Sequence, residues 1–294
     1  MNKVSLKQFG ARNIYVISEK QNTKRRQQFI QDWQHFTDFN YQFIDAIMGK
    51  EIHIRSLLEQ GRLKSFWCGE AAITRNIIGC FESHRKVWKK IAESSPRSDD
   101  YSLVLEDDAR LTPHFTSTAI QSGEFNKILK FIDNATVNCF WWGRADQRVS
   151  GNSHNKFTKI PDPYLSLGAH AYMIRRSFAE LLLNESEKIE MPVDVLISHQ
   201  CRRMGRSYAP NYSYIRQVQH MLGQRFFIDG HINEMWGSTT QPQRKDGSGN
   251  VMKDMYIHIS EDFKPFVKNV TPNYFNNEAA GYLIELGRDG KVLI

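Results

Sequence analysis

The stretch Tyr101-Ser-Leu-Val-Leu-Glu-Asp-Asp108 joins a short apolar run to three consecutive carboxylates. An apolar run of this length, bounded by polar residues, predicts a buried β-strand. Glu106, Asp107 and Asp108 then stand at the carboxyl end of that strand. Open α/β sheets bind their ligands beyond the carboxyl ends of their strands. The stretch therefore indicates a layered sheet with a ligand site at one edge.

Three adjacent carboxylates repel one another, and a divalent cation would relieve that repulsion. Carboxylate oxygens suit Mg²⁺ or Mn²⁺, and these ions in turn bridge the oxygens of a diphosphate. The alternative is a solvated turn or a helix cap, since Thr112 and Pro113 follow closely. On the residues alone, both interpretations remain open.

Patterns typical of strands and helices alternate over the first 200 residues, on both sides of this stretch, and predict an α/β sheet. Further strands are expected at 13–17, 41–44, 137–142 and 165–174. The strongest helical pattern runs from Glu70 to Ile91 and repeats every three or four residues, at Ile73, Ile77, Phe81, His84, Trp88 and Ile91. Shorter helices are expected at 52–62, 177–183 and from Pro192 to about Arg203, and an earlier helix should bury Phe29, Ile30, Trp33 and Phe36.

The composition is that of a globular protein. Of its 294 residues, 40% are hydrophobic and 24% are charged, which excludes a long disordered chain. The 18 Phe, 11 Tyr and 6 Trp can fill a sizeable core. The net charge of +7 fits either an anionic ligand or simple solubility. A nucleic-acid-binding protein is disfavoured because that charge is its only support and no binding motif accompanies it.

Cysteine usage and the basic start bear on the cellular compartment. Cys68, Cys80, Cys139 and Cys201 lack C-x-x-C spacing and are expected to be reduced thiols. The start, MNKVSLKQFGARN, has no long apolar core and is not expected to be a secretory signal. No apolar run approaches the roughly 20 residues that span a bilayer. A cytoplasmic location is expected, with association at the inner face of a membrane left open.

The segment Gly79-Cys-Phe-Glu-Ser-His-Arg85 falls within the long predicted helix. A Ser83-His84 nucleophile pair is excluded, because adjacent residues of a helix point about 100° apart. His84 shares a helix face with Phe81 and Trp88, which favours a buried core histidine over a ligand or base. Contact with a bound ligand remains the alternative.

Two later features carry chemistry of their own. Gly168-Ala-His-Ala-Tyr172 contains small residues that either admit a sugar or nucleotide close to the backbone or pack tightly between strands. Asp194 follows Pro192 at a predicted helix start, among apolar neighbours. It is expected either to cap that helix or to act as a catalytic base.

These segments together resemble glycosyltransferase family 25, the lipopolysaccharide-core and procollagen β-galactosyltransferase family. The resemblance covers about residues 12–220 in order and spacing, and it rests on Ile14–Ile17 with Arg25 or Arg26 downstream, IGCFESHRKVW at 78–88, LVLEDDA at 103–109, LGAHAYMIRRSFAELLL at 167–183 and PVDVL at 192–196. Two positions depart from the family pattern. Ile17-Ser18 stands where the family has Asn-Leu, and Asn76-Ile77 stands where it has Gly-Glu.

The resemblance implies an α/β fold of the GT-A type, a Rossmann-like nucleotide-sugar fold with a mixed sheet flanked by helices. It implies a glycosyltransferase domain at 1–220 and a C-terminal extension at 221–294 packed on the same domain. Residues 237–250, GSTTQPQRKDGSGN, are polar throughout and are expected to form a mobile loop.

The implied activity is the inverting, metal-dependent transfer of galactose or glucose from a UDP-sugar to a hydroxyl of a glycan or hydroxylated acceptor, as in lipopolysaccharide biosynthesis. Mn²⁺ or Mg²⁺ is expected on Glu106 and Asp108, with Asp107 in support. Asp194 is the first candidate for the base and Asp146 the second. A non-catalytic module that binds a nucleotide-sugar or carbohydrate on the same fold is the alternative.

The resemblance also places nucleotide contacts at two segments. The first strand end is expected to contribute Ile17, Ser18 and Glu19, with Arg25 or Arg26 near the phosphates. Further contacts are expected from Ser83, His84 and Arg85 of the long helix, and a late metal ligand from His220. No nucleic-acid partner is expected, and the oligomeric state is left open.

Overall fold

The structure is a computed structural model, and it describes Ala11 and residues 13–33, 40–63, 65–68, 75–94, 100–111, 127–128, 130–132, 137–143, 157–159, 168–210, 215–217, 271–275 and 279–285. The chain forms two compact units whose segments alternate along the sequence. The first unit contains residues 1–46, 84–183 and 194–236, and the second contains 47–83, 184–193 and 237–294.

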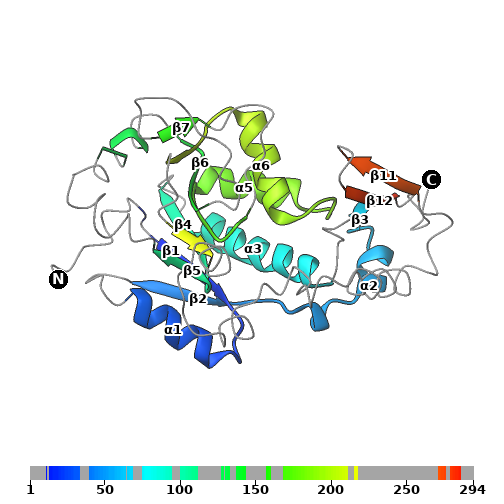
Figure 1. The fold of residues 1–294 in the computed structure, drawn as a ribbon, viewed down its shortest axis with the longest axis horizontal. Helices are drawn as coiled ribbons and strands as arrows, with labels where there is room; N and C mark the ends of the chain where they lie inside the picture. The colour runs from blue at the N-terminus through cyan, green and yellow to red at the C-terminus, as the bar shows by residue number, and fades with distance from the viewer. Residues whose placement is uncertain are drawn as a thin grey trace. The chain divides into compact units, whose positions relative to one another are not determined.

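The first unit contains a seven-stranded mixed sheet in the order β2-β1-β4-β8-β6-β9-β7 (Figure 1). Its strands are β1 (Asn13–Ser18), β2 (Tyr41–Asp45), β4 (Tyr101–Glu106), β6 (Cys139–Gly143), β7 (Phe157–Lys159), β8 (Ala171–Arg175) and β9 (Ser207–Pro210). Strands β2, β1 and β4 run parallel, whereas β8 is antiparallel to both β4 and β6. A separate antiparallel pair joins β5 (Ala109–Leu111) to β10 (Ile215–Gln217).

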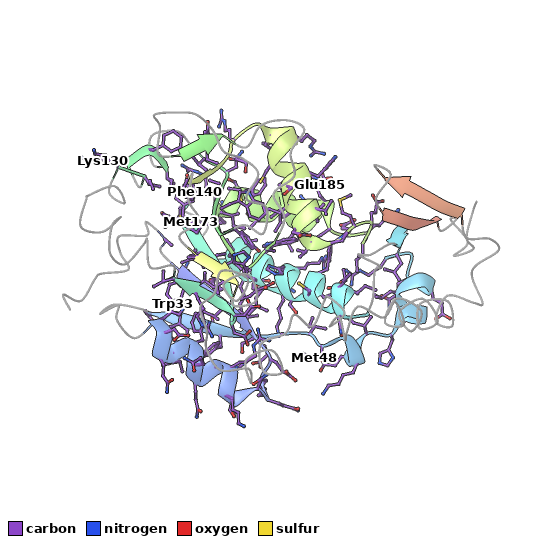
Figure 2. All side chains as sticks on the ribbon, in the orientation of Figure 1. Trp33, Met48, Lys130, Phe140, Met173 and Glu185 are labelled. Carbon is purple, nitrogen blue, oxygen red and sulfur yellow. The ribbon has the colours of Figure 1, made fainter. Side chains whose placement is uncertain are left out.

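One face of this sheet packs against helix α1 (Thr23–Trp33). Phe29 and Trp33 of α1 are fully buried in one cluster with alternate residues of the strands, among them Ile14, Val16, Leu103, Phe140 and Met173 (Figure 2). The prediction that Ile30 joins them is wrong, since its side chain is 43% exposed. Ile30 is rotated by about 100° from Phe29 around the helix and therefore leaves the buried stripe.

The opposite face carries the other alternate residues, because successive strand residues point to opposite sides of a sheet. Tyr172, next to Met173 in β8, contacts His84 and Trp88 of helix α3 (Arg75–Glu93). Two further helices in the described residues are α5 (Arg176–Glu185) and α6 (Val193–Met204). The predicted α/β architecture, a Rossmann-like mixed sheet flanked by helices, is confirmed.

The second unit contains an antiparallel three-stranded sheet in the order β11-β12-β3. Its elements are η2 (Gly49–Glu51), α2 (Ile54–Glu59), β3 (Ser65–Cys68), β11 (Thr271–Phe275) and β12 (Ala279–Glu285). The domain boundary expected at residue 220 and the loop expected at 237–250 lie outside the described residues, so both stay predictions.

None of the helices in the described part of the chain is both long and apolar enough to cross a bilayer. Cys80, Cys139 and Cys201 form no disulfide bond among the described residues, and the last two are buried.

Candidate active site at the carboxyl edge of the parallel strands

Strands β2, β1 and β4 run parallel and end at the same edge of the sheet. Their last residues are Asp45, Ser18 and Glu106, and the register pairs Ser18 with Asp45 and Ile17 with Glu106. Glu106 is followed by a turn made of Asp107 and Asp108, which leads into β5. The structure thus places the three carboxylates, here called the acidic turn (Glu106, Asp107 and Asp108), at the edge where the sequence predicts a ligand site.

Asp107 is held by three contacts from neighbouring segments. Its backbone N–H donates to the carbonyl of Ile17 over 3.0 Å, and the Ser18 hydroxyl donates to its Oδ2 over 2.7 Å. Arg25 Nη2 lies 2.5 Å from its Oδ1. Burial raises the pKa of Asp107, while the Arg25 charge and the Ser18 hydrogen bond oppose that rise. Both carboxylate oxygens of Asp107 therefore have protein partners.

Asp108 is the least satisfied member of the acidic turn. It is 4% exposed, and its Oδ1 finds no hydrogen-bond partner among the described residues. Its Oδ2 lies 3.6 Å from Arg25 Nη2. Burial, followed by the charge of Glu106, raises the pKa of Asp108 to about 7. A buried carboxyl with an unpartnered oxygen is costly, and this cost marks Asp108 as a candidate ligand-binding residue.

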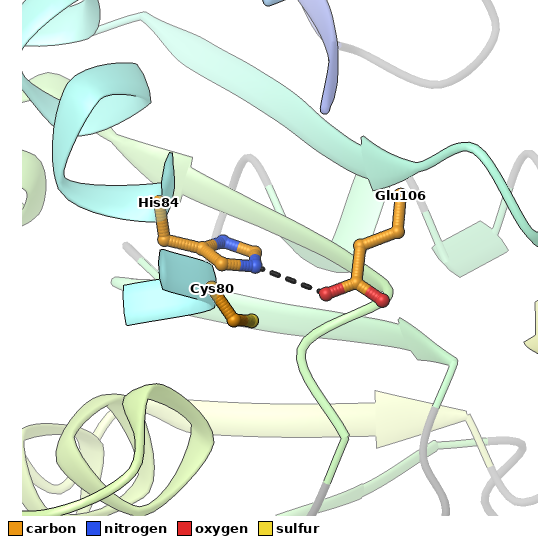
Figure 3. Close-up of side chains that lie close together, drawn as sticks. All are labelled: Cys80, His84 and Glu106. Carbon is orange, nitrogen blue, oxygen red and sulfur yellow. Dashed lines mark hydrogen bonds and ion pairs between the residues drawn. The ribbon is translucent and has the colours of Figure 1, made fainter. Parts of the chain in front are cut away.

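The Glu106 side chain points toward His84 of α3 (Figure 3). His84 Nε2 lies 3.2 Å from Glu106 Oε1, and His84 Nδ1 lies 2.8 Å from the hydroxyl of Tyr172. The Trp88 indole N–H donates to that same hydroxyl over 2.9 Å. Because an indole can only donate, the network is satisfied when Tyr172 donates to His84 Nδ1 and His84 Nε2–H donates to Glu106.

This network fixes the orientation and the charge of Glu106. Although burial raises its pKa, the hydrogen bond from His84 and nearby positive charge outweigh that effect and hold the pKa of Glu106 below its usual range. Glu106 is therefore ionised at neutral pH, whereas Asp108 is only partly ionised. The acidic turn thus combines one fixed anion, Glu106, with one carboxyl, Asp108, whose Oδ1 lacks a hydrogen-bond partner among the described residues.

Ser83 and His84 both have partners within the protein, and their expected nucleotide contacts stay predictions. His84 is fully buried, and both of its ring nitrogens have protein partners. The Ser83 hydroxyl donates to the carbonyl of Gly79 over 2.6 Å and accepts the N–H of Ile47 over 2.8 Å. Both side chains therefore stabilise the protein's own packing. Arg85 is partly buried, and its contact with a phosphate stays a prediction.

The structure distinguishes between the two arginines of α1. Arg25 pairs with Asp107 of the acidic turn. Arg26 instead pairs with Asp45 over 2.7 Å, donates to the hydroxyl and carbonyl of Ser18, and lies over the Phe43 ring. Arg25 is thus the one already at the acidic turn.

The other residues expected at the first strand end lie close by. Ile17 and Ser18 are buried at the end of β1, where the Ile17 carbonyl and the Ser18 hydroxyl both bind Asp107. Glu19 is partly exposed just beyond the strand. Ser18 therefore supports the acidic turn directly, and the nucleotide contacts of all three residues stay predictions.

Asp194 lies in the first turn of α6 and binds two backbone N–H groups. Its Oδ2 accepts from Gly168 over 2.9 Å, and its Oδ1 accepts from Val195 over 2.9 Å. Gly168 has a φ of 86°, a conformation that favours glycine. Burial raises the pKa of Asp194, and the two backbone hydrogen bonds oppose the rise. The other expected base, Asp146, and the expected late ligand, His220, lie outside the described residues.

Three residues of this region were missed by the sequence reasoning. Asp45 ends a predicted strand just as Glu106 does, so the same signal could have found it. Tyr172 lies in the quoted Gly168–Tyr172 segment, but its role depends on α3. Arg110 donates to the carbonyls of Asp107 and Ala109 over 2.9 Å each and pairs with Asp32, and no sequence pattern indicates this clamp.

Replacing Tyr172 by Phe is expected to lower both the free energy of unfolding and the affinity of the acidic turn for Mn²⁺. The change removes the hydroxyl that binds His84 and Trp88 in a fully buried site, at a cost of roughly 2–4 kcal/mol for two lost partners. Thermal unfolding should show the loss, and Mn²⁺ affinity should fall because His84 no longer fixes Glu106. Tyr41→Phe, which alters a half-buried tyrosine in β2, is the control. Unchanged stability would contradict the hydrogen-bond network.

Comparison with known proteins identifies the family. The model of glycosyltransferase family 25, described as an LPS biosynthesis protein, matches residues 11–197. That range includes the acidic turn, Arg25, His84 and Asp194. The chain belongs to glycosyltransferase family 25. The resemblance inferred from the sequence motifs is thus confirmed.

Several curated proteins share this family 25 region. Procollagen galactosyltransferases 1-A and 1-B of Xenopus laevis are 24% and 30% identical over 255 residues, and the alignments cover 78% of this chain. A glycosyltransferase 25 family member of Aedes aegypti is 28% identical over 125 residues, which cover 40% of this chain and 20% of that protein. The chain spans 39% of the length of each frog protein.

The acidic turn of this family 25 chain fits a divalent cation. Asp108 offers an oxygen without a hydrogen-bond partner, and Glu106 offers a carboxylate that His84 holds ionised. Hard divalent cations prefer such carboxylate oxygens. The binding of an ion by Glu106 and Asp108 stays a prediction, and Ser18 and Arg110 contact the turn through Asp107.

Proposed function

We propose that the chain transfers galactose or glucose from a UDP-sugar to a hydroxyl of a glycan or hydroxylated acceptor, with inversion and with Mn²⁺ or Mg²⁺ bound to Glu106 and Asp108. The observation that carries this proposal is the buried Asp108 at the carboxyl edge of the parallel strands, whose Oδ1 has no hydrogen-bond partner among the described residues. Family membership and the galactosyltransferases among the relatives support the transferase class and the sugar.

The residues of the acidic turn and its neighbours have different roles in the proposed reaction. The bound cation would stabilise the negative charge that develops on the departing diphosphate. Ser18, His84 and Arg110 keep the acidic turn in the geometry that this requires, through the contacts already described. Arg25 would add a second positive charge beside the phosphates. Each of these groups acts by position and charge, without a covalent step.

The acceptor hydroxyl must lose its proton to a base on the side opposite the departing UDP. Asp194 is the proposed base, with Asp146 as the second candidate. Burial raises the pKa of Asp194, which brings a carboxylate closer to the range useful for a general base near neutral pH. A cytoplasmic site of action, including the inner face of a membrane, remains part of the proposal.

UDP is expected to bind tightly only in the presence of a divalent cation. Calorimetry of UDP with Mn²⁺ and with EDTA should show an affinity at least about tenfold higher with the metal, because the ion links the carboxylates to the diphosphate. UDP-galactose and UDP-glucose should then be hydrolysed slowly in the presence of Mn²⁺.

The two readouts separate the candidate functions. Equal UDP affinity with Mn²⁺ and EDTA would remove the metal from the proposal. Metal-dependent UDP binding without hydrolysis or transfer of any sugar would favour the non-catalytic binding module.

A further inference from the structure

Arg25 pairs with two carboxylates of the acidic turn. Its Nη2 lies 2.5 Å from Asp107 Oδ1 and 3.6 Å from Asp108 Oδ2. The Arg25 side chain is only 13% exposed, and the side chains of Asp107 and Asp108 are 7% and 5% exposed. Without a metal, Arg25 is thus the counter-ion of the acidic turn.

The backbone of Arg25 is fixed, so any change of partner must come from its side chain. Its N–H donates to the Asn22 side chain over 3.2 Å at the start of α1. Further along α1, Phe29 and Trp33 are fully buried in the core and anchor the helix. The long arginine side chain retains several rotatable bonds. It can therefore leave Asp107 while the helix stays in place.

The neighbouring arginine, Arg26, is bound to several groups outside the acidic turn. Arg26 is bound at once to Asp45, to the Ser18 hydroxyl and to the Ser18 carbonyl, and it lies over Phe43. None of these groups belongs to the acidic turn. Of the two arginines, only Arg25 binds carboxylates that would also face a metal.

We propose that Arg25 and a divalent cation compete for the acidic turn, so that metal binding releases the Arg25 side chain to bind the diphosphate of the donor. The inference rests on the proposed function, because it takes the acidic turn as the metal site. Two cations beside the same buried carboxylates repel one another, which gives the competition its physical basis. Diphosphate oxygens are good bidentate acceptors for the released guanidinium.

The competition predicts two opposite effects of Arg25 on affinity. Without nucleotide, Arg25 lowers the affinity for the metal. With the metal bound, Arg25 raises the affinity for the nucleotide. Arg25→Gln should therefore bind Mn²⁺ alone about tenfold more tightly than wild type, because no charge-assisted hydrogen bond has to be broken. The same variant should bind UDP in saturating Mn²⁺ about tenfold more weakly. Arg25→Lys, which keeps the charge, should bind Mn²⁺ alone nearly as wild type does.

The experiment is a titration of the full chain with Mn²⁺, in which free Mn²⁺ is followed by electron paramagnetic resonance, and then a titration of the Mn²⁺-saturated protein with UDP. Lys24→Gln is the matched control, since it removes one positive charge from the exposed side of the same helix. It should change either affinity by less than about twofold. Thermal unfolding with and without Mn²⁺ provides a second readout, and Mn²⁺ should raise the melting temperature of Arg25→Gln more than that of wild type.

The outcomes are distinct. Tighter Mn²⁺ binding together with weaker UDP binding in Arg25→Gln supports the competition. Unchanged or weaker Mn²⁺ binding in that variant overturns it, while metal-dependent UDP binding by wild type would leave the proposed function intact. Absence of Mn²⁺ binding by wild type, with or without UDP, would instead remove the metal site and the inference with it.

Discussion

Asp108→Asn should reduce sugar transfer by about a hundredfold or more while making the metal-free protein more stable. The loss of transfer follows from the loss of one charged ligand to the cation. The gain in stability follows from removal of a buried carboxyl whose pKa is raised to about 7. These two effects have opposite signs, and a residue with a purely structural role would not show both.

The pH dependence of stability tests the same residue. A carboxyl whose pKa is raised by folding keeps its proton in the folded protein while the unfolded chain loses it. The free energy of unfolding of the metal-free wild type should therefore fall as the pH rises through the window from the ordinary aspartate value of 3.8 to about 7. Above this window, Asp108→Asn should be more stable by roughly 2–4 kcal/mol.

Denaturant unfolding at several pH values, with EDTA and with Mn²⁺, measures this difference. Mn²⁺ should raise the stability of wild type and leave that of Asp108→Asn nearly unchanged. Glu93→Gln is the control, because this glutamate is 64% exposed and distant in sequence from the acidic turn. If folded Asp108→Asn keeps near-wild-type turnover, the assignment of Asp108 as a metal ligand is wrong.

The elements with long or continuous patterns could be predicted from the sequence. Strand β4 and the helix after residue 75 follow directly from an apolar run and a three-to-four-residue repeat, and the structure confirms both. Strands β5, β7 and β10 have three residues each and were missed. A run of three residues is too short to show a period, so its pairing is decided by tertiary contacts.

The position of the acidic turn could also be predicted, but its partners could not. Three carboxylates after an apolar strand are visible in the sequence, whereas the His84–Glu106 contact joins a helix and a strand that only the fold brings together. The choice between Arg25 and Arg26 was left open for a related reason. Adjacent helix residues point about 100° apart, and only the position of α1 decides which one faces Asp107.

Asp194→Asn is expected to lower turnover by about a hundredfold or more if Asp194 is the general base. If Asp194 only capped the helix, the change would be structurally neutral, because Asn caps helices about as well as Asp. The structure shows otherwise, since the two oxygens of Asp194 each accept a backbone N–H, from Gly168 and Val195. Asn has one carbonyl oxygen, so its amide group would face one of these donors.

The substitution should therefore also reduce stability by roughly 1–3 kcal/mol, whatever the catalytic role of Asp194. Turnover must be measured well below the unfolding transition, together with UDP affinity in saturating Mn²⁺. Tyr101→Phe is a stability-matched control, because it removes a buried hydroxyl that binds the Val137 carbonyl over 2.7 Å and lies at the other end of β4 from the acidic turn. Its turnover should stay near that of wild type.

A catalytic Asp194 predicts a large fall in kcat for Asp194→Asn, unchanged UDP affinity and a loss of stability similar to that of Tyr101→Phe. A purely structural Asp194 predicts the same loss of stability with most of the kcat retained. Wild-type kcat should also rise with pH through the raised pKa of this carboxyl, and that rise should disappear in the variant. If Asp194→Asn keeps its turnover, Asp194 serves to hold Gly168 in place before β8, and Asp146→Asn becomes the next variant to test for the base.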